Sequence, residues 1–118
     1  GHPVGDKVIL IVVAAFRKHL RETDILARYG GDEFTVLLPG TSLADAAHIA
    51  EAIRNEVASS KALDEYDGPV KKLGTSQGIA SFPETAKDLA ALKSQADAAL
   101  YHAKEAGRNR VHISTPVA

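Results

Sequence analysis

The chain contains no cysteine, no methionine and no tryptophan among its 118 residues. Without cysteine it has no disulfide framework and no thiolate chemistry, which suits a reducing compartment. We expect a cytoplasmic location, and the alternative is the cytoplasmic domain of a larger, membrane-anchored protein. Because methionine is missing even at position 1, we expect an excised or trimmed part of a longer polypeptide.

Neither sign of charge dominates, since 14 basic and 15 acidic side chains leave a net charge of −1. This balance argues against a surface that coats nucleic acid. The apolar run at residues 8–16 is closed by Arg17 and Lys18 and is too short to span a bilayer. No signal peptide is visible. The length and a 45% apolar composition indicate one globular domain.

Hydrophobic periodicity predicts three helices, at residues 7–20, 43–57 and 88–106. The first is rich in β-branched residues, so a strand is the competing assignment, and the third could break near Ser94 and Gln95. Ser42 is the expected N-cap of the second helix, and Gly107 is expected to end the third. The inward-facing positions that we expect are Ile9, Val12, Val13, Phe16 and Leu20, then Ala46, Ile49, Ala50, Ile53 and Val57, then Leu89, Leu92, Ala96, Ala99, Leu100 and Ala103.

Strands are predicted at residues 25–29, 34–38, 73–82 and 111–113, separated by turn-forming or polar segments. Residues 59–72 are expected to form a loop or hairpin tip, and residues 114–118 a frayed tail. This order predicts the α+β class, with helices covering one side of a mainly antiparallel sheet.

Gly30 and Gly31 lie between the first two strands, where a two-residue hairpin turn needs positive φ. Two carboxylates, Asp32 and Glu33, follow at the tip. Bare backbone beside paired acids suits a phosphate-bearing ligand with a divalent cation, although a hairpin alone is more often a plain solvated turn. Regular alternation would send the two acids to opposite faces. No P-loop motif is present, so phosphate binding of that kind is excluded.

Four ordered blocks, at residues 1–6, 28–34 (RYGGDEF), 76–80 and 96–111, together resemble the GGDEF family. Those proteins are diguanylate cyclases, which condense two GTP molecules into cyclic di-GMP. The resemblance covers residues 1–113 and implies a ferredoxin-like, adenylyl-cyclase-type antiparallel sheet with packed helices and a protruding hairpin. In the family a strand and a helix precede the position of Gly1, carrying a metal-binding Asp and a guanine-reading Asn. That first strand is absent from this chain.

The resemblance also implies roles for the hairpin residues and for one acid near the start. Asp32 would coordinate Mg²⁺ (Mn²⁺ is the alternative), and Glu33 would assist at the metal or at the attacking ribose 3′-hydroxyl. Gly30 and Gly31 would let phosphates approach the backbone closely. Asp6 would read guanine, although it is equally suited to be the N-cap of the first helix.

Two further pairs gain roles from the resemblance. Lys104 and Arg108, four apart and expected on one helix face, would grip GTP phosphates; otherwise they complement the helix dipole. Arg21 and Asp24 match an Arg-x-x-Asp inhibitory site for the product, and a solvated i,i+3 ion pair is the plainer interpretation.

The family further implies catalysis by a homodimer and control by an upstream sensory or receiver domain. We expect these 118 residues alone to be poorly active. The alternatives are a silent module that senses cyclic di-GMP or GTP, and a fragment that has no native activity or pairs by exchanging elements. The five histidines lack metal-ligand spacing.

Overall fold

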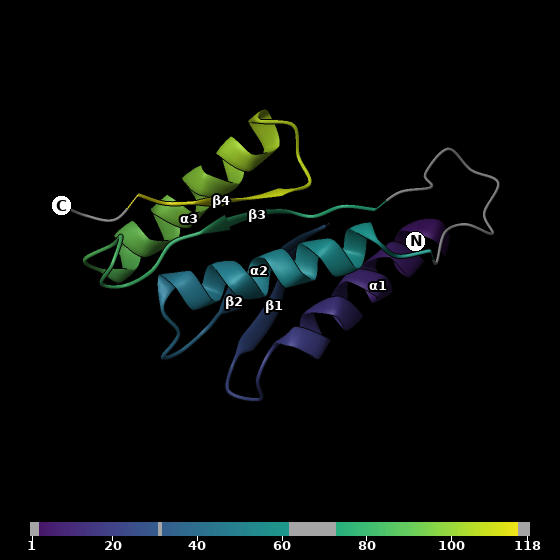
Figure 1. Cartoon of the computed structure of the whole chain (residues 1–118), viewed down its shortest axis with the longest axis horizontal. Coiled ribbons are helices and arrows are strands. Elements are labelled where there is room, and N and C mark those ends of the chain that lie inside the picture. Colours follow the sequence, from purple (N-terminus) through teal and green to yellow (C-terminus); the bar gives the residue numbers. More distant parts are fainter. Residues whose placement is uncertain (1–2, 31, 62–72, 116–118) are drawn as a thin grey trace.

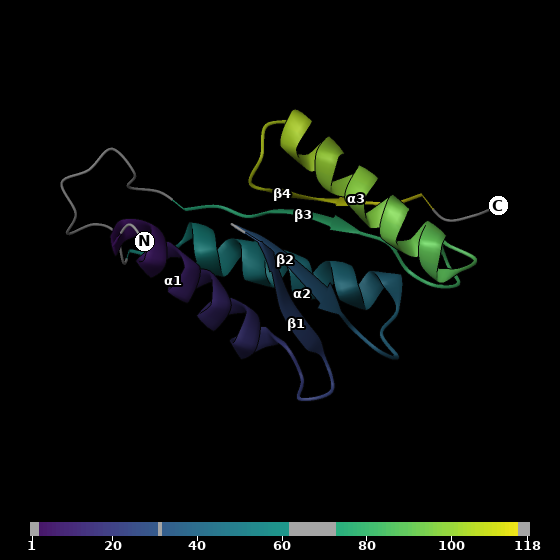
Figure 2. The same cartoon turned by 180° about the vertical axis from the view of Figure 1, so that it is seen from behind.

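The computed structural model describes residues 3–30, 32–61 and 73–115, with side chains from residue 5 onward. Helix α2 (Leu43–Ala58) runs through the middle of the molecule (Figure 1). Helix α1 (Pro3–His19) lies along one side of it, and strands β1 (Ile25–Gly30) and β2 (Glu33–Leu37) cross behind it in this view. Strands β3 (Ser76–Ile79) and β4 (Arg110–Ile113) and helix α3 (Leu89–Glu105) lie on the other, and the reverse view agrees (Figure 2).

Helix α1 begins at Pro3, earlier than the periodicity predicted, and the competing strand assignment is wrong. Proline is tolerated in a first helical turn because its missing N–H would have no partner there. Asp6 therefore lies inside the first turn and is not the N-cap. Ala15 and Phe16 are the buried residues of this helix.

The structure confirms the predicted N-cap of helix α2 and the predicted apolar stripe along it. The Ser42 side chain accepts a hydrogen bond from the backbone N–H of Asp45, at 3.1 Å. Its inner face packs on α1 to form the core of Ala15, Phe16, Ile53 and Val57, against which Val12, Leu20, Leu26, Val36, Ile49 and Leu73 are half-buried. Burying this stripe is what fixes α1, α2 and the hairpin together.

Strands β1 and β2 form the predicted antiparallel hairpin, but its turn is displaced by one residue. Gly30 is the last residue of β1 and pairs with Glu33, and the register is irregular between Arg28 and Gly30. Among the described glycines only Gly40 and Gly107 have positive φ. Gly30 therefore belongs to the strand and not to the turn, which includes Asp32; residue 31 lies outside the described residues. The irregularity adds a residue to β1, which explains why a simple two-glycine turn was the wrong prediction.

Strand β3, helix α3 and strand β4 form a compact crossover unit. β3 is shorter than predicted and pairs in parallel with β4, as strands joined by a crossover helix do. α3 is continuous past Ser94 and Gln95, so the expected break is wrong. Leu89 is 77% exposed and faces outward, because it is only the first residue after the Asp88 cap.

Gly78 is the point of closest approach within this unit. A Cβ there would meet the backbone nitrogen of Leu100 and the carbonyl oxygen of Ala96, so only glycine fits between β3 and α3. At the end of the unit, Ser114 donates its N–H to the Ile79 carbonyl at 2.9 Å. Ser114 is therefore held in place and not frayed.

The α+β class and the hairpin are confirmed, with finer organisation that the sequence did not indicate. The described strands form two separate two-stranded sheets, β1–β2 antiparallel and β3–β4 parallel. Most of the expected loop at residues 59–72 and the last three residues of the expected tail lie outside the described residues.

Candidate functional site

The hairpin tip presents two exposed carboxylates. Asp32 lies in the turn and Glu33 is the first residue of β2. Phe34 anchors the tip, because its ring lies 5.9 Å from that of Phe16 on α1, centroid to centroid. The alternation of β2 thus turns an apolar ring inward while the acids stay in solvent.

Glu33 forms an ion pair with a lysine that is distant from it in the sequence. Its Oε1 lies 3.6 Å from the Nζ of Lys104, in the last turn of α3, and both side chains are partly exposed. Such a pair adds little stability in solvent. Its significance lies in placement, since a predicted metal-binding acid and a predicted phosphate-binding cation are brought together.

The donor set at the tip fits a hard divalent cation only in part. Asp32 and Glu33 supply the oxygen ligands that Mg²⁺ prefers. Within residues 3–30, 32–61 and 73–115, however, no three Asp, Glu or His side chains converge in a way that could hold a metal ion. The carboxylates of this chain would thus form part of a coordination sphere.

Arg108 lies beyond the end of α3, which corrects the argument that it shares a helix face with Lys104. The N–H of Arg108 bonds to the Ala103 carbonyl at 3.0 Å and that of Gly107 to the Lys104 carbonyl at 3.3 Å. These are the two bonds of a Schellman cap. Gly107 has φ +122° and Arg108 has φ +63°, so the chain reverses and exposes the Arg108 side chain beside the helix end.

Asp6 stands apart from the other predicted substrate residues. It is exposed in the first turn of α1. Both views show the start of α1 away from α3 and its C-terminal end (Figures 1 and 2). The described residues thus join Glu33 to Lys104 but bring Asp6 to neither.

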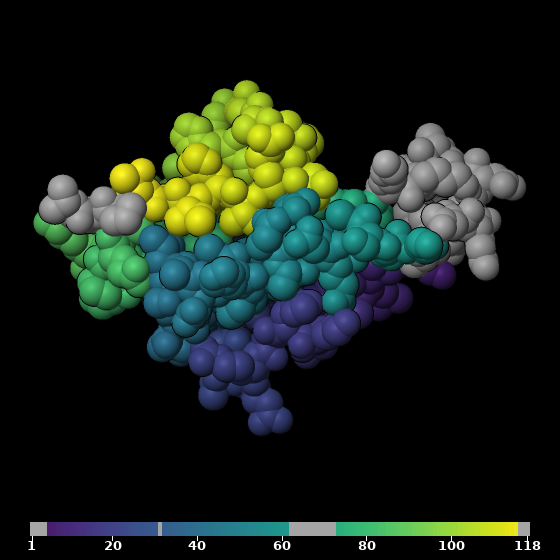
Figure 3. Space-filling view, viewed as in Figure 1, coloured from purple at the N-terminus to yellow at the C-terminus, as the bar shows by residue number. Residues whose placement is uncertain are grey.

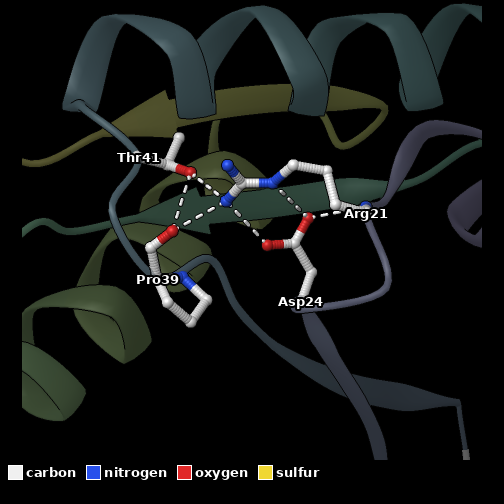
Figure 4. A network of polar contacts seen from close by, with 4 residues as sticks. All are labelled: Arg21, Asp24, Pro39 and Thr41. Atoms are coloured by element: carbon white, nitrogen blue, oxygen red, sulfur yellow. Dashed lines mark hydrogen bonds and ion pairs between the residues drawn. The ribbon is translucent and has the colours of Figure 1, made fainter.

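Arg21 and Asp24 form a network that ties two turns together (Figure 4). The Asp24 Oδ2 accepts from the Arg21 backbone N–H at 2.8 Å and faces its Nε at 3.4 Å, while Oδ1 accepts from Nη2 at 2.9 Å. The same Nη2 donates to the Pro39 carbonyl at 2.7 Å and to Thr41 Oγ1 at 2.8 Å. The turn before β1 is thereby bound to the turn after β2.

The Asp24 side chain has no exposed surface, whereas that of Arg21 is 53% exposed. Hydrogen bonds from the Arg21 side chain and then from its backbone hold the pKa of the Asp24 carboxyl below its ordinary value. The same pairing raises the pKa of Arg21. The interpretation as a plain solvated ion pair is therefore wrong, because one partner is fully covered and the other has additional acceptors.

Two partners at this site were missed from the sequence. Thr41 and the Pro39 carbonyl belong to a turn motif that gave no sign of contact with Arg21. A second omission is Lys93 of α3, whose Nζ lies 5.4 Å from the centre of the Tyr29 ring in β1. Both contacts depend on how segments distant in sequence come together, which no local pattern records.

Comparison with known proteins identifies the class to which these features belong. Residues 1–110 match the family model described as "Diguanylate cyclase, GGDEF domain". Diguanylate cyclase DgcP of Pseudomonas aeruginosa is 40% identical over 97% of this chain, and response regulator PleD of Caulobacter vibrioides is 36% identical over 94%. The chain spans only 16% and 24% of those two proteins.

Solved structures give the same result. The GGDEF domain of YfiN from Pseudomonas aeruginosa superposes with a TM-score of 0.83 at 37% identity, over 99% of this chain and 72% of that one. The GGDEF domain of DgcB from Caulobacter crescentus, in complex with c-di-GMP, gives 0.79 at 32% identity, over 96% and 66%. This chain belongs to the GGDEF family of diguanylate cyclases. None of its described helices has the length and apolar character needed to cross a membrane.

Proposed function

We propose that this chain is the catalytic part of a diguanylate cyclase that joins two GTP molecules into cyclic di-GMP. The observation that carries the proposal is the 3.6 Å approach of Glu33 to Lys104. It unites an acid of the RYGGDEF hairpin with a cation beside the capped end of α3, from which Arg108 also projects. A nucleoside triphosphate needs both kinds of group at its phosphates.

In each half-reaction the 3′-hydroxyl of one GTP attacks the α-phosphate of the other. A new P–O bond forms, the bond to pyrophosphate breaks and the hydroxyl proton is released, so two such steps close the ring. Lys104 and Arg108 would bind phosphate oxygens and Asp6 would read guanine. Gly30 and Gly31 would admit the phosphates close to the backbone.

Mg²⁺ or Mn²⁺, bound by Asp32 and Glu33, would supply charge neutralisation at the phosphates. Glu33 would in addition orient the attacking hydroxyl. Because one domain holds one GTP, two copies would face each other in a homodimer, with an upstream sensory or receiver domain controlling their approach. Most of the rate acceleration would come from positioning the two bound GTP molecules.

The product would return to Arg21 and Asp24 and restrain the enzyme. The presence of both residues of the Arg-x-x-Asp pattern, joined in one network, supports this role. The same network, together with the incomplete metal donor set among the described residues, favours a second candidate. This is a catalytically silent module that senses cyclic di-GMP or GTP.

One experiment distinguishes the cyclase from the sensor. The purified protein is incubated with GTP and Mg²⁺, and the nucleotides are separated chromatographically. Cyclic di-GMP should accumulate slowly with these 118 residues alone and fall at least tenfold further with Glu33→Gln, while Glu105→Gln, an exposed acid outside the site, should match the unaltered protein. Cyclic di-GMP binding without any synthesis would instead establish the sensor.

A further inference from the structure

Two histidines meet where helix α3 faces strand β4. The rings of His102, in α3, and His112, in β4, lie 5.1 Å apart from centre to centre, at an angle of 36°. Both residues are exposed. The end of α3 and strand β4, yellow-green and yellow in Figure 3, lie side by side at the surface. The spacing of these histidines along the chain predicted no metal site, because only folding brings them together.

The register of the β3–β4 pair explains why the two rings meet. His112 is opposite Gly78, and residues that are opposite each other in register share one face of a sheet. Gly78 is the residue on which the backbone of α3 packs, so His112 also faces that helix. His102 lies one helical turn after the buried Ala99, at the border of the inner face of α3. The backbone therefore holds both side chains near each other while solvent still reaches them.

The ring nitrogens of both histidines are open to a ligand. Within residues 3–30, 32–61 and 73–115, neither imidazole has a hydrogen-bond or ion-pair partner. His19 differs, because its Nε2 lies 3.0 Å from Oε1 of Glu56. The χ2 torsion of histidine is broad, so a small rotation can turn one nitrogen of each ring toward a shared ligand. The pair thus offers two imidazole ligands without the loss of a hydrogen bond in the described part of the chain.

Two imidazoles at this separation fit a transition-metal cation. Metal–nitrogen bonds of about 2.0–2.1 Å place the centres of two imidazoles on one tetrahedral Zn²⁺ roughly 5 Å apart. Imidazole suits Zn²⁺, Cu²⁺ and Ni²⁺, whereas Mg²⁺ takes oxygen ligands. A cation held by these rings would therefore differ in kind from the one proposed at Asp32 and Glu33.

We propose that His102 and His112 bind one divalent transition-metal cation of the Zn²⁺ class, with water in its remaining coordination positions. Lys104 follows His102 by two positions and pairs with Glu33, and residues two apart on a helix face different sides. The site is thus separate from the proposed GTP site and does not depend on the proposed function. Because its ligands come from α3 and β4, the cation would fasten these elements across the turn that carries Arg108.

Isothermal titration calorimetry with zinc chloride tests the site on the purified protein without a polyhistidine tag. We expect one Zn²⁺ per chain with a micromolar Kd, because two protein ligands are fewer than those of the strongest sites. An excess of Mg²⁺ should not displace it. His102→Phe and His112→Phe each keep a ring in the pair but lose its nitrogens. Each should weaken Zn²⁺ binding by about tenfold or more, since one of the two ligands is gone.

Controls separate this site from general binding to surface histidines. His48→Phe makes the same change at an exposed histidine of α2 and should leave the affinity unchanged. His102→Gln keeps a good helix former and repeats the test if His102→Phe folds poorly, which thermal unfolding without metal detects. In the unaltered protein Zn²⁺ should raise the Tm and slow amide exchange at the end of α3 and in β4 more than in α2.

Each remaining outcome overturns the proposal. One is a titration without saturable binding of one Zn²⁺ per chain. Another is unchanged affinity in either phenylalanine variant of the pair, since the two rings would then form an aromatic contact only. An equal loss in His48→Phe would assign the binding to scattered surface histidines. Cyclic di-GMP synthesis is measured separately, so failure of this site and failure of the proposed function are distinguishable.

Discussion

The rings of Phe16 and Phe34 lie 5.9 Å apart, at an angle of 38°. Phe34 directly follows the two acids of the hairpin, and Phe16 is a buried residue of the α1–α2 core. The position of the acids is therefore set by the core on which their neighbour packs. A side chain outside the predicted substrate site can in this way set the position of the two acids that are proposed to act in catalysis.

Replacing Phe34 by leucine tests this coupling. The substitution keeps an apolar group but loses the ring pair, worth about 0.5–1.5 kcal/mol beyond the buried area. We expect a loss of that size in the free energy of urea unfolding. Amide hydrogen exchange should also accelerate in β1 and β2 more than in α3. Equal acceleration in all elements would mean that the ring stabilises the domain without specifically holding the hairpin.

Lys104→Met should remove a phosphate contact while keeping the side chain's length. A hydrogen bond to a charged group is worth about 1.5–3 kcal/mol, so kcat/KM for GTP should fall roughly tenfold to a hundredfold. The unfolding free energy should stay nearly unchanged, since the exposed pair with Glu33 contributes little. Lys87→Met is the matched control, because Lys87 is an exposed lysine outside the site. An activity loss as large at Lys87 would remove the argument for Lys104.

Gly78→Ala should destabilise the β3–α3 contact. The new methyl group would collide with backbone atoms of Ala96 and Leu100, which cannot rotate away. Overpacking of this kind costs about 1–3 kcal/mol or more, measurable as a lower urea midpoint. Gly30→Ala is the contrasting variant, since its Cβ would meet nothing within 4 Å. Its stability should change by less than about 0.5 kcal/mol, whereas its activity should fall if phosphates approach that backbone.

The Asp24 network should make stability depend on pH. Because the folded-state pKa of the Asp24 carboxyl is below its ordinary value, folding favours the ionised form. Its contribution is complete above the unfolded pKa of about 3.9 and is lost as the pH falls through the folded pKa. The difference in Tm between the unaltered protein and Asp24→Asn should be constant from about pH 7 to pH 5 and shrink below pH 4. A difference that persists unchanged at low pH contradicts this account.

Arg108→Gly should separate stability from function. Arg108 has φ +63°, a left-handed conformation that costs a non-glycine residue about 1 kcal/mol. Glycine adopts it freely, so the variant should be as stable as the unaltered protein or slightly more stable in thermal unfolding. Cyclic di-GMP synthesis should nevertheless fall, because the guanidinium is gone. If the variant instead unfolds more easily and retains its activity, Arg108 serves the helix cap and not the phosphates.

The sequence predicted best those features that depend on a few neighbouring residues. The Ser42 cap, the Gly107 cap and the inner stripe of α2 follow from local backbone chemistry and helical spacing, and all three are present. The residues of the two inferred sites came from motif resemblance. The sequence did not predict that Glu33 and Lys104 lie close together, which only the folded chain shows.

The remaining features depend on contacts between distant segments. The bond from Arg21 to Thr41 requires two turns to meet, and neither turn alone indicates the other. The parallel pairing of β3 with β4 follows from the α3 crossover, which strand propensity does not encode. The displaced hairpin turn has the same origin, because a register irregularity is a property of two strands and not of one.

The network around Arg21 also has a mechanical consequence for the hairpin. Arg21 and Asp24 precede β1, while Pro39 and Thr41 follow β2, so the bonds between them close the base of the two strands. A slip of one residue between the strands would turn Phe34 and Val36 outward. With the base fastened, such a slip would require these bonds to break together. The two strands of the hairpin are thus prevented from sliding past each other.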